Sequence, residues 1–230
     1  MNQKQTWDNI APDWHKFKTQ PAKHVLEFLK NKKGKILDLG SGAGRHLIKT
    51  KGTLYLIDFS EKMIKLAKKM AKEKRIKAEF FVASAEKLPF ENNFFDYAIA
   101  IAIFHCIPKK AHKKAVKEFY RVLKPGAQAE IAVWNKNSKR FKNAPKEKYV
   151  GWRDKGKRYY YLFEEKEIHD LFRKAGFKIL KSLNNSFRLG NAQKSSQDKK
   201  ISDIKKKIGS EVNILFIVKK PKVNYSKGRL

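Results

Sequence analysis

Cysteine, acidic residues and long apolar runs are scarce in this sequence of 230 residues. The single cysteine, Cys106, excludes an internal disulfide and a cysteine-rich zinc site, so no metal site is expected. No apolar run approaches the ~18 residues that a membrane helix needs, and the polar first residues lack the apolar core of a signal peptide. We therefore expect a cytoplasmic protein that has no membrane anchor.

Acidic residues number 22 against 54 lysines and arginines, which gives a formal net charge of +32. This excess is larger than solubility requires and indicates a polyanionic partner, with nucleic acid ahead of a membrane surface. The alternative is a lysine bias of the whole proteome. Lysines on predicted helix faces, such as Lys65, Lys68 and Lys72, fit that alternative well.

The segment 136–158 fits a general lysine bias less well, because its charge is concentrated and mixed with aromatic rings. It contains ten basic residues against only Glu147 and Asp154. Aromatic residues lie within the segment or directly after it: Phe141, Tyr149, Trp152, Tyr159, Tyr160 and Tyr161. Basic side chains neutralise phosphates and flat rings stack on unpaired bases, so the pattern predicts RNA binding.

A glycine-rich loop follows the apolar run 35–39, which predicts a buried strand, a tight loop and then a helix. The loop runs Gly40-Ser41-Gly42-Ala43-Gly44, and its glycines let the backbone approach a ligand closely because no Cβ intervenes. A dinucleotide-binding loop would have its third glycine at the position of Arg45. A P-loop is excluded because no Gly-Lys-Ser/Thr follows.

Two aspartates distinguish between nucleoside cofactors. Asp38 directly precedes the loop, where its negative charge would repel a pyrophosphate and suit a cationic ligand. Asp58 ends the second apolar run, where it would present a carboxylate to ribose hydroxyls. S-adenosylmethionine carries an ammonium and a sulfonium but no phosphate, so the charges favour it over NAD or FAD. The alternative is a glycine-rich turn that binds nothing.

Apolar periodicity predicts an α/β fold with a doubly wound, mostly parallel sheet and ligands at the carboxyl ends of its strands. The expected divisions are a helical N-terminal cap, a cofactor-binding core, a basic aromatic insertion, a C-terminal helix and hairpin that contain a mobile loop, and a tail. Their respective ranges are 1–33, 34–134, 135–163, 164–220 (loop 184–210) and 221–230.

The chain resembles class I S-adenosylmethionine-dependent methyltransferases from the first predicted strand to the fifth. The matching pieces are 37–44 (Leu-Asp-Leu-Gly-Ser-Gly-Ala-Gly), Asp58, 85–90 (Ala-Glu-Lys-Leu-Pro-Phe), Phe95-Asp96 and 123–126 (Leu-Lys-Pro-Gly). The resemblance implies a Rossmann-like, seven-stranded sheet that ends in an antiparallel hairpin. It also implies a cofactor site made of Asp38, Gly40, Ser41, Gly42, Gly44, Asp58, Phe59, Ser84, Ala85 and Ile101.

Further pieces are similar to the tRNA wobble-uridine carboxymethyl methyltransferases, which O-methylate a 5-carboxymethyl group on uridine 34. They are 7–11 (Trp-Asp-Asn-Ile-Ala), 99–105 (Ile-Ala-Ile-Ala-Ile-Phe-His), Val133-Trp134, 158–163 (Arg-Tyr-Tyr-Tyr-Leu-Phe) and Asn213. This resemblance implies catalytic roles for His105, Arg158 and Lys18. It implies a substrate site made of Lys18, Trp134, Arg158, Tyr159, Tyr160 and Asn213, and as partners tRNA and a small zinc-ribbon activator protein.

Four positions depart from that family's pattern and bear on the substrate. This chain has Lys18 where the family has an arginine and Cys106 where it has the second of two histidines. It has Tyr161 where the family has a histidine and Ser84 where it has an aspartate. Two other classes of function therefore stay open. One is a small-molecule methyltransferase that acts on a quinone precursor or a fatty acid, and the other is an RNA-binding module without enzymatic activity.

The expected chemistry agrees with a carboxylate acceptor. A carboxylate has a reference pKa near 4 and needs no general base, only cations and hydrogen-bond donors that hold it. We expect Lys18, Arg158 and His105 to supply these. Methylation of a pyrimidine carbon would need a cysteine nucleophile. A cysteine at the end of a buried strand, such as Cys106, is more often a packed core residue than a nucleophile. The Asp/Asn-Pro-Pro-aromatic element that receives exocyclic base nitrogens is missing.

Overall fold

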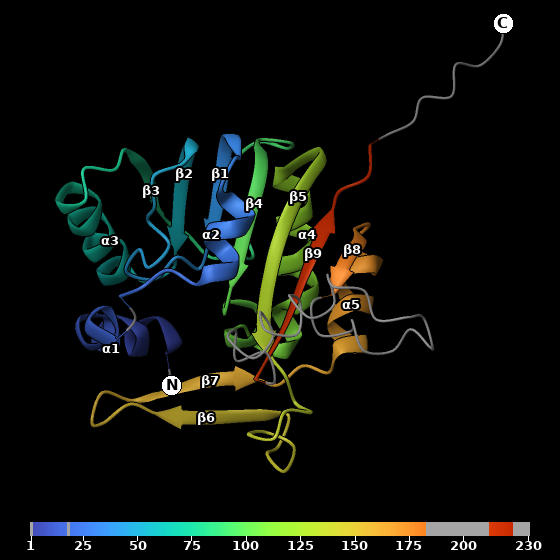
Figure 1. Ribbon diagram of the computed structural model, residues 1–230. Helices are drawn as coiled ribbons and strands as arrows, with labels where there is room; N and C mark the ends of the chain where they lie inside the picture. The colour runs from blue at the N-terminus through green and yellow to red at the C-terminus, as the bar shows by residue number, and fades with distance from the viewer. Residues whose placement is uncertain (1, 18, 183–211, 223–230) are drawn as a thin grey trace, which may run out of the picture.

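The computed structural model describes residues 2–17, 19–182 and 212–222, which form a central seven-stranded sheet and a separate hairpin (Figure 1). Lys18 and the predicted loop 184–210 lie outside the described residues, as does the tail after residue 222.

The strands of the central sheet lie in the order β3-β2-β1-β4-β5-β9-β8. Their bounds are β1 Lys33–Leu39, β2 Lys51–Asp58, β3 Ala78–Val82, β4 Phe95–Ile101, β5 Leu123–Trp134, β8 Lys178–Ser182 and β9 Asn213–Lys219. The first five strands pair in parallel, whereas β9 is antiparallel to both β5 and β8. This order confirms the Rossmann-like class I architecture with a terminal antiparallel hairpin.

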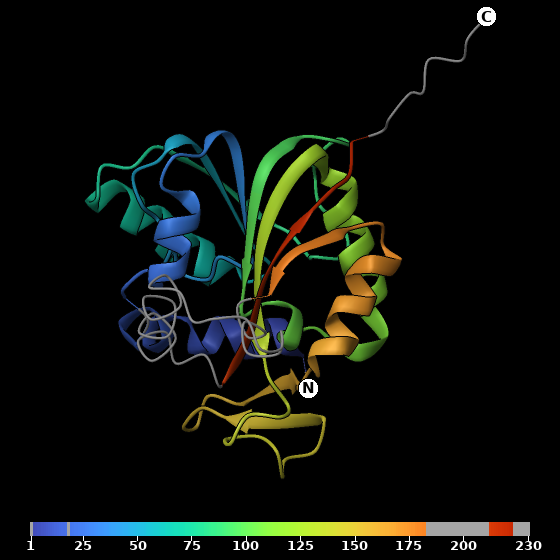
Figure 2. The ribbon, with the colours of Figure 1, turned by 45° about the vertical axis from the view of Figure 1, so that its right-hand side comes forward.

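Helices cover both faces of this sheet, so that it is the middle of three layers (Figure 2). The α-helices are α1 Gln3–Phe17, α2 Lys23–Leu29, α3 Glu61–Glu73, α4 His112–Val122 and α5 Glu165–Lys174, and the short 3₁₀ turns are η1 Phe104–Cys106 and η2 Lys109–Ala111. Helices α2 and α3 pack on one face, and α4 and α5 on the other. Within the described ranges, none of these helices has the length and apolar character of a membrane span.

Strand β1 shows how the sequence builds this core. Leu37 and Leu39 belong to the apolar cluster under α4, whereas Ile36 belongs to the cluster under α2 and α3. Successive side chains of a strand point to opposite faces, so a central parallel strand must be apolar on both sides. Each fully buried Leu or Ile contributes about 1.5–3 kcal/mol. Asp38, on the α2 face between these residues, is therefore conspicuous as a buried acid.

Strand β5 follows α4 without an intervening loop. It begins at Leu123 and contains the run Lys124-Pro125-Gly126-Ala127. The pairing with β4 shifts register between Phe95 and Tyr97, and Gly126 adopts a φ of 89°. A glycine in the left-handed region accommodates the irregularity within one long strand.

A second sheet contains the strands β6 (Glu147–Gly151) and β7 (Lys157–Tyr161), which form an antiparallel hairpin beyond the carboxyl ends of β1 to β5 (Figure 1). The interpretation of this segment as a display of rings for stacking on bases is largely wrong. Tyr159, Tyr160 and Tyr161 are each at most 5% exposed. Both faces of β7 are covered, so the rings pack internally, and Tyr149 on β6 is the exposed one.

Helix α1 joins this hairpin to the central fold. The side chain of Gln3 accepts the N–H of Tyr159 at 2.8 Å and donates to the carbonyl of Lys157 at 3.2 Å. On its other side, α1 contacts the start of α3, where the hydroxyl of Ser60 donates to Asp8 at 2.6 Å. The helix therefore lies between the glycine-loop half of the sheet and the hairpin.

Candidate functional site

The glycine loop connects β1 to β2 and has the conformation that its sequence requires. Gly40 has a φ of 70°, and a Cβ on it would lie 2.6 Å from the side chain of Ile103. Gly42 has a φ of 54°, but a Cβ there would have no neighbour closer than 3.9 Å. Gly40 thus permits close packing, whereas Gly42 borders open space. The expected helix after the loop is not formed; residues 42–46 form turns instead.

Asp58, at the end of β2, fixes the loop. Its Oδ2 accepts the N–H of Gly42 at 2.9 Å, and its Oδ1 accepts the N–H of Ser60 at the same distance. Burial raises the pKa of Asp58 to about 6, against the lowering effect of these backbone donors. The carboxylate is positioned for further acceptor contacts such as ribose hydroxyls would make.

Asp38 is a buried acidic group of the loop region that has almost no polar partners. Only 1% of its surface is exposed, and its Oδ2 has no hydrogen-bond partner among the described residues. The nearest basic atom, Nδ1 of His46, lies 3.9 Å away, and burial lowers the pKa of His46 to about 3, so the ring is neutral. Burial, followed by repulsion from Asp58, raises the pKa of Asp38 to about 8. A buried acid without a donor fits a cationic ligand.

A small cavity lies between the glycine loop, the end of β4 and helix α1. It is lined by Trp7, Trp14, Gly40, Ser41, Gly42, Arg45, His46, Asp58, Phe59, Met63, Ile101, Ala102, Ile103 and Cys106. The structure thus brings Gly40, Ser41, Gly42, Asp58, Phe59 and Ile101 together, as the sequence predicted. Ser84 and Ala85 follow β3 but do not line this cavity, and Gly44 packs against Leu47 instead.

A large cavity of about 600 Å³ adjoins the small one. The two share Trp7, Trp14, Arg45, Ile101, Ala102 and Cys106. The rest of the lining comes from Phe17, Pro21, Ala22, Lys23, His24, His105, Ala132, Trp134, Arg140, Val150, Trp152, Arg158, Tyr160, Val212 and Asn213. A ligand in the small cavity can therefore meet a second ligand at the end of β4, where Ala102 has a φ of 64°.

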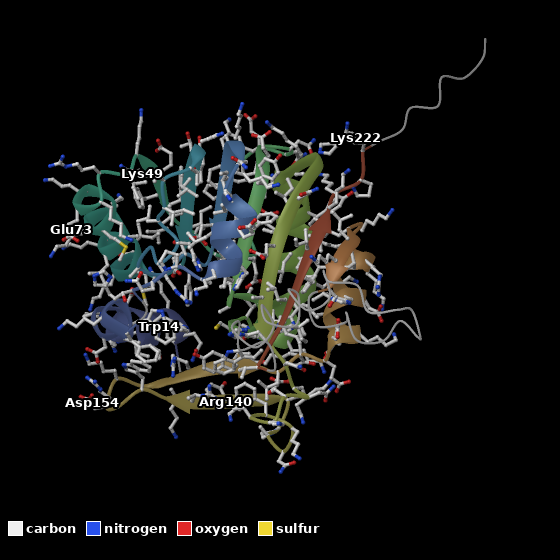
Figure 3. The ribbon with its side chains drawn as sticks, viewed as in Figure 1. Trp14, Lys49, Glu73, Arg140, Asp154 and Lys222 are labelled. Atoms are coloured by element: carbon white, nitrogen blue, oxygen red, sulfur yellow. The ribbon has the colours of Figure 1, made fainter. Side chains whose placement is uncertain are left out.

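Arg158 of β7 reaches the large cavity through a cage of four aromatic rings. Its guanidinium carbon lies 4.8 Å from the ring of Trp152, 5.2 Å from Tyr160, 5.3 Å from Trp14 and 5.7 Å from Trp7. Figure 3 shows Trp14 on the side of α1 that faces the hairpin. The residue is 5% exposed, and its Nε has no hydrogen-bond partner in the described parts of the chain. The cage holds the cation by cation–π attraction and leaves the N–H of Nε unpaired.

Of the two roles expected for Lys18, Arg158 and His105, cation or hydrogen-bond donor, His105 of η1 fits only that of donor. Burial, followed by His112, lowers its pKa to about 3. Its Nδ1 accepts the backbone N–H of Trp134 at 3.0 Å, so the ring proton is on Nε2. The ring stacks on Trp134 with a centroid distance of 4.9 Å. His105 therefore offers a hydrogen-bond donor without positive charge.

The predicted substrate residues of strand β7 do not all face the large cavity. Tyr160 and Arg158 line the large cavity, whereas the intervening Tyr159 does not. Its hydroxyl donates to Glu147 at 2.8 Å and accepts from the N–H of Lys109. The assignment of Tyr159 to the substrate site is wrong because neighbouring strand residues point to opposite faces. Trp134 and Asn213, which are paired in register on β5 and β9, line the cavity as expected.

Sequence reasoning missed the tryptophans that close both cavities. Trp7 and Trp14 recur at a helical spacing, which does not by itself distinguish a residue of the core from one in a cavity wall. Cys106 also lines both cavities. Burial raises the pKa of its thiol, and the S–H donates to the carbonyl of Ala102 at 3.4 Å. A protonated thiol is not the nucleophile that methylation of a pyrimidine carbon needs.

Comparisons with known proteins agree with this site. The profile of the family described as "Methyltransferase domain" matches residues 36–126, from β1 to the start of β5. Residues 36–126 thus resemble a methyltransferase domain, and the strand order of the sheet is that of the class I fold. The cofactor is S-adenosylmethionine, and the buried carboxyl of Asp38, which precedes the glycine loop but does not itself line the small cavity, fits its cationic part.

Curated relatives of this methyltransferase domain include two named as tRNA (carboxymethyluridine(34)-5-O)-methyltransferases. The Schizosaccharomyces pombe protein is 28% identical over 209 residues, which cover 76% of this chain and 88% of that protein. The Arabidopsis thaliana protein is 33% identical over 132 residues, and the chain spans only 31% of its length. A ubiquinone/menaquinone biosynthesis C-methyltransferase of Rickettsia felis is 44% identical over 102 residues, which cover 39% of this chain and 40% of that protein.

Solved structures share the fold of this methyltransferase domain over nearly its full length. A methyltransferase of Methanosarcina mazei has a TM-score of 0.63 and 21% identity and covers 88% of this chain and 99% of its own. A Haloferax volcanii methyltransferase complex with the Trm112 activator has a TM-score of 0.63 and 18% identity, with 94% and 97% coverage. The [4+2]-cyclase SpnF has a TM-score of 0.67, 18% identity and 95% coverage of both chains, so the fold alone does not define the reaction.

Proposed function

We propose that this methyltransferase domain transfers the methyl group of S-adenosylmethionine to the carboxylate of 5-carboxymethyluridine at wobble position 34 of tRNA. The observation that carries the proposal is Arg158. It is a buried cation with an unpaired Nε that lines the large cavity next to the cofactor site. A planar guanidinium is the side chain best suited to hold and orient a carboxylate.

The chemistry requires only positioning by the protein. When bound, S-adenosylmethionine supplies an electrophilic methyl group on its sulfonium. Arg158 binds the acceptor carboxylate from the large cavity, and Nε2–H of His105 supplies a second donor there. A carboxylate is ionised at neutral pH and attacks the methyl group in line without a general base. The protonated thiol of Cys106 and the neutral ring of His105 are consistent with a mechanism without a base.

The charge of the chain supports a polyanionic substrate, although part of the hairpin charge is neutralised internally. Lys146 pairs with Glu164 and Glu167 at 3.2 and 3.0 Å, and Asp13 pairs with both Arg153 and Lys155 at 3.2 Å. These pairs remove three cations from the count of basic residues in the segment 136–158. The net charge of +32 already includes these acids, so a large basic excess remains.

The relatives support the same assignment and extend it to partners. The S. pombe protein named for this reaction matches over most of its length. A fold neighbour was solved with the Trm112 activator. We therefore include tRNA and a small zinc-ribbon activator protein among the partners of this chain.

Mass spectrometry of nucleosides from tRNA tests the proposal most directly. We expect tRNA from a strain that lacks this gene to accumulate 5-carboxymethyluridine and to lose its methyl ester. The purified protein, with its activator if required, should then transfer a labelled methyl group to that tRNA. Equal labelling of tRNA without the carboxymethyl group would contradict the acceptor assignment.

A small-molecule acceptor is the second candidate, and the 44% identity with the R. felis quinone C-methyltransferase favours it. The same labelling assay decides between them when a demethylated quinone precursor replaces tRNA. Methyl transfer to the quinone precursor together with inert tRNA would establish the second candidate. Binding of tRNA without any methyl transfer would instead support an RNA-binding module.

A further inference from the structure

A buried glutamate and a histidine form a polar pair that the proposed reaction does not use. Glu130 lies in the middle of β5, in register with Ile99 of β4 and Ile217 of β9, and is 2% exposed. Its Oε2 lies 3.3 Å from Nδ1 of His24 on α2. Both atoms are buried, the contact between them lacks the geometry of a hydrogen bond, and neither has a hydrogen-bond partner within the described residues.

The surroundings of Glu130 give no packing reason for a carboxylate. Its neighbours in the sheet are the apolar residues Ile99 and Ile217, and a leucine would fill such a position without desolvating a charge. A buried acid beside a histidine is explained if it orients the histidine ring for contact with a ligand. Carboxylates orient metal-binding and catalytic histidines in this way. The described residues contain no group of three or more potential ligands placed to hold a metal ion.

The pair lies at the inner end of the large cavity. Glu130, Ala132 and Trp134 are alternate residues of β5 and point to the same face of the sheet, toward α2. Ala132 and Trp134 line the large cavity, and so does His24. The ring of His24 is therefore part of the cavity wall, and Glu130 lies behind it.

The orientation of the ring defines what His24 offers to a ligand. A carboxylate oxygen 3.3 Å away attracts an N–H, so Glu130 favours the tautomer of His24 whose proton is on Nδ1. In the neutral ring, Nε2 is then an acceptor. The polar edge of uracil has one N–H donor, N3–H, between two carbonyl groups, and bases removed from a stack are recognised by hydrogen bonds to this edge.

We propose that His24, held in place by Glu130, recognises the pyrimidine of the substrate by accepting a hydrogen bond from N3–H at Nε2. The inference rests on the proposed function in taking a uridine nucleoside as the ligand. His24 is then a binding residue that contacts the base, and Glu130 is a positioning residue that acts through it. Arg158 and His24 would hold the two ends of the modified base, its carboxylate and its Watson–Crick edge.

Nitrogen NMR of the histidine rings tests the contact without requiring catalysis. Histidine-labelled protein, saturated with S-adenosylhomocysteine, is titrated with 5-carboxymethyluridine and with its N3-methyl derivative. The His24 signal is assigned by its absence in His24→Leu. We expect a shift of Nε2 with the first nucleoside and none with the second. An Nε2 that does not respond to the first, or that responds equally to both, overturns the proposal.

A double variant tests the role in methyl transfer while avoiding an unpaired buried charge. His24→Leu/Glu130→Leu removes both polar groups, so we expect it to fold and to bind S-adenosylmethionine as the wild type does. The KM for tRNA should rise at least tenfold, whereas kcat changes less. His169→Leu is the matched control, since it removes another histidine with an unpartnered buried nitrogen, on α5. An unchanged KM in the double variant would contradict the inference.

These results separate the inference from the proposed function. If wild-type protein labels carboxymethylated tRNA but Nε2 of His24 does not respond, only the inference fails. If tRNA is not labelled but the nucleoside shifts Nε2 selectively, the proposed reaction fails and the recognition of uridine by His24 stands.

Discussion

The backbone N–H of Trp134 donates to Nδ1 of His105 at 3.0 Å, and this hydrogen bond determines which nitrogen of the ring is a donor. Strand β5 and turn η1 are thereby joined at the wall of the large cavity. Because the pKa of His105 is lowered to about 3, the ring keeps this donor and remains neutral over the physiological range of pH.

Substitutions of His105 should distinguish its two nitrogens. The amide N–H of glutamine reaches approximately the position of Nε2, whereas that of asparagine reaches Nδ1. We expect His105→Gln to retain more methyl transfer than His105→Asn, and the pH profile of kcat to keep its shape in His105→Gln because the wild-type ring does not titrate there. Steady-state kinetics at saturating S-adenosylmethionine measures both effects. Loss of a titration near pH 6.5 in His105→Gln would show that the ring is charged during the reaction.

Binding of S-adenosylmethionine should release protons. Burial raises the pKa of Asp38 to about 8 and that of Asp58 to about 6, so Asp38 is largely protonated at pH 7 without a ligand. A cationic ligand favours the ionised form, and affinity should therefore rise as pH increases from 6 to about 8. Calorimetry at pH 7 in buffers of different ionisation enthalpy measures the release, which Asp38→Asn should abolish. Proton uptake on binding would contradict the assignment.

The same raised pKa predicts how stability depends on pH. The folded-state pKa of Asp38 exceeds its unfolded value of about 3.9, so the folded state binds an extra proton between these values. Its contribution is fully present below pH ~4 and is lost as pH rises to about 8. The unfolding free energy of ligand-free wild type relative to Asp38→Asn should fall across this window. Urea denaturation at several pH values measures this difference in unfolding free energy. The histidines titrate alike in both proteins, so their contributions cancel in the comparison.

Arg158 should be sensitive even to substitution by lysine. An ammonium cannot stack on the four rings or hold a carboxylate with two N–H groups. Removing one partner of a buried ion pair costs roughly 2–5 kcal/mol, so we expect Arg158→Lys to lower kcat/KM for tRNA by about 30-fold or more. Affinity for S-adenosylmethionine should change little. Lys148→Met, on the neighbouring strand β6, is a control, and an equal loss there would indicate a general charge effect.

Alanine substitutions of Gly40 and Gly42 should have different effects. Gly40→Ala creates a positive-φ alanine and a contact of 2.6 Å with Ile103, so it should destabilise the fold by at least ~1–2 kcal/mol. Gly42→Ala has the same φ problem but no clash, and its methyl group would point into the small cavity. We expect Gly42→Ala to lose more affinity for S-adenosylmethionine than stability, as thermal unfolding with and without the cofactor would show. Equal effects of both variants on unfolding alone would contradict this distinction.

The sequence could predict that the glycine loop and Asp58 lie together because that information is local. Asp38, the glycines and Asp58 all follow or end apolar runs, and parallel strands bring their carboxyl ends together. The substrate side depends on which face of β7 meets the cavity. Tyr159 and Tyr160 are adjacent and identical in the sequence, and only the packing of the hairpin against α1 separates them. The neutrality of His105 depends on its burial, which the sequence does not encode locally.

Helix α1 contributes Trp7 and Trp14 to both cavities, and its first half is hydrogen-bonded to the start of α3 through Asp8 and to β7 through Gln3. A displacement of this one helix would alter the walls that both ligands contact. Thermodynamic reciprocity then requires that whatever the cofactor does to the affinity for the acceptor, the acceptor does equally to the affinity for the cofactor. The order in which the two bind, and the release of the demethylated cofactor, are therefore linked through a single short segment at the start of the chain.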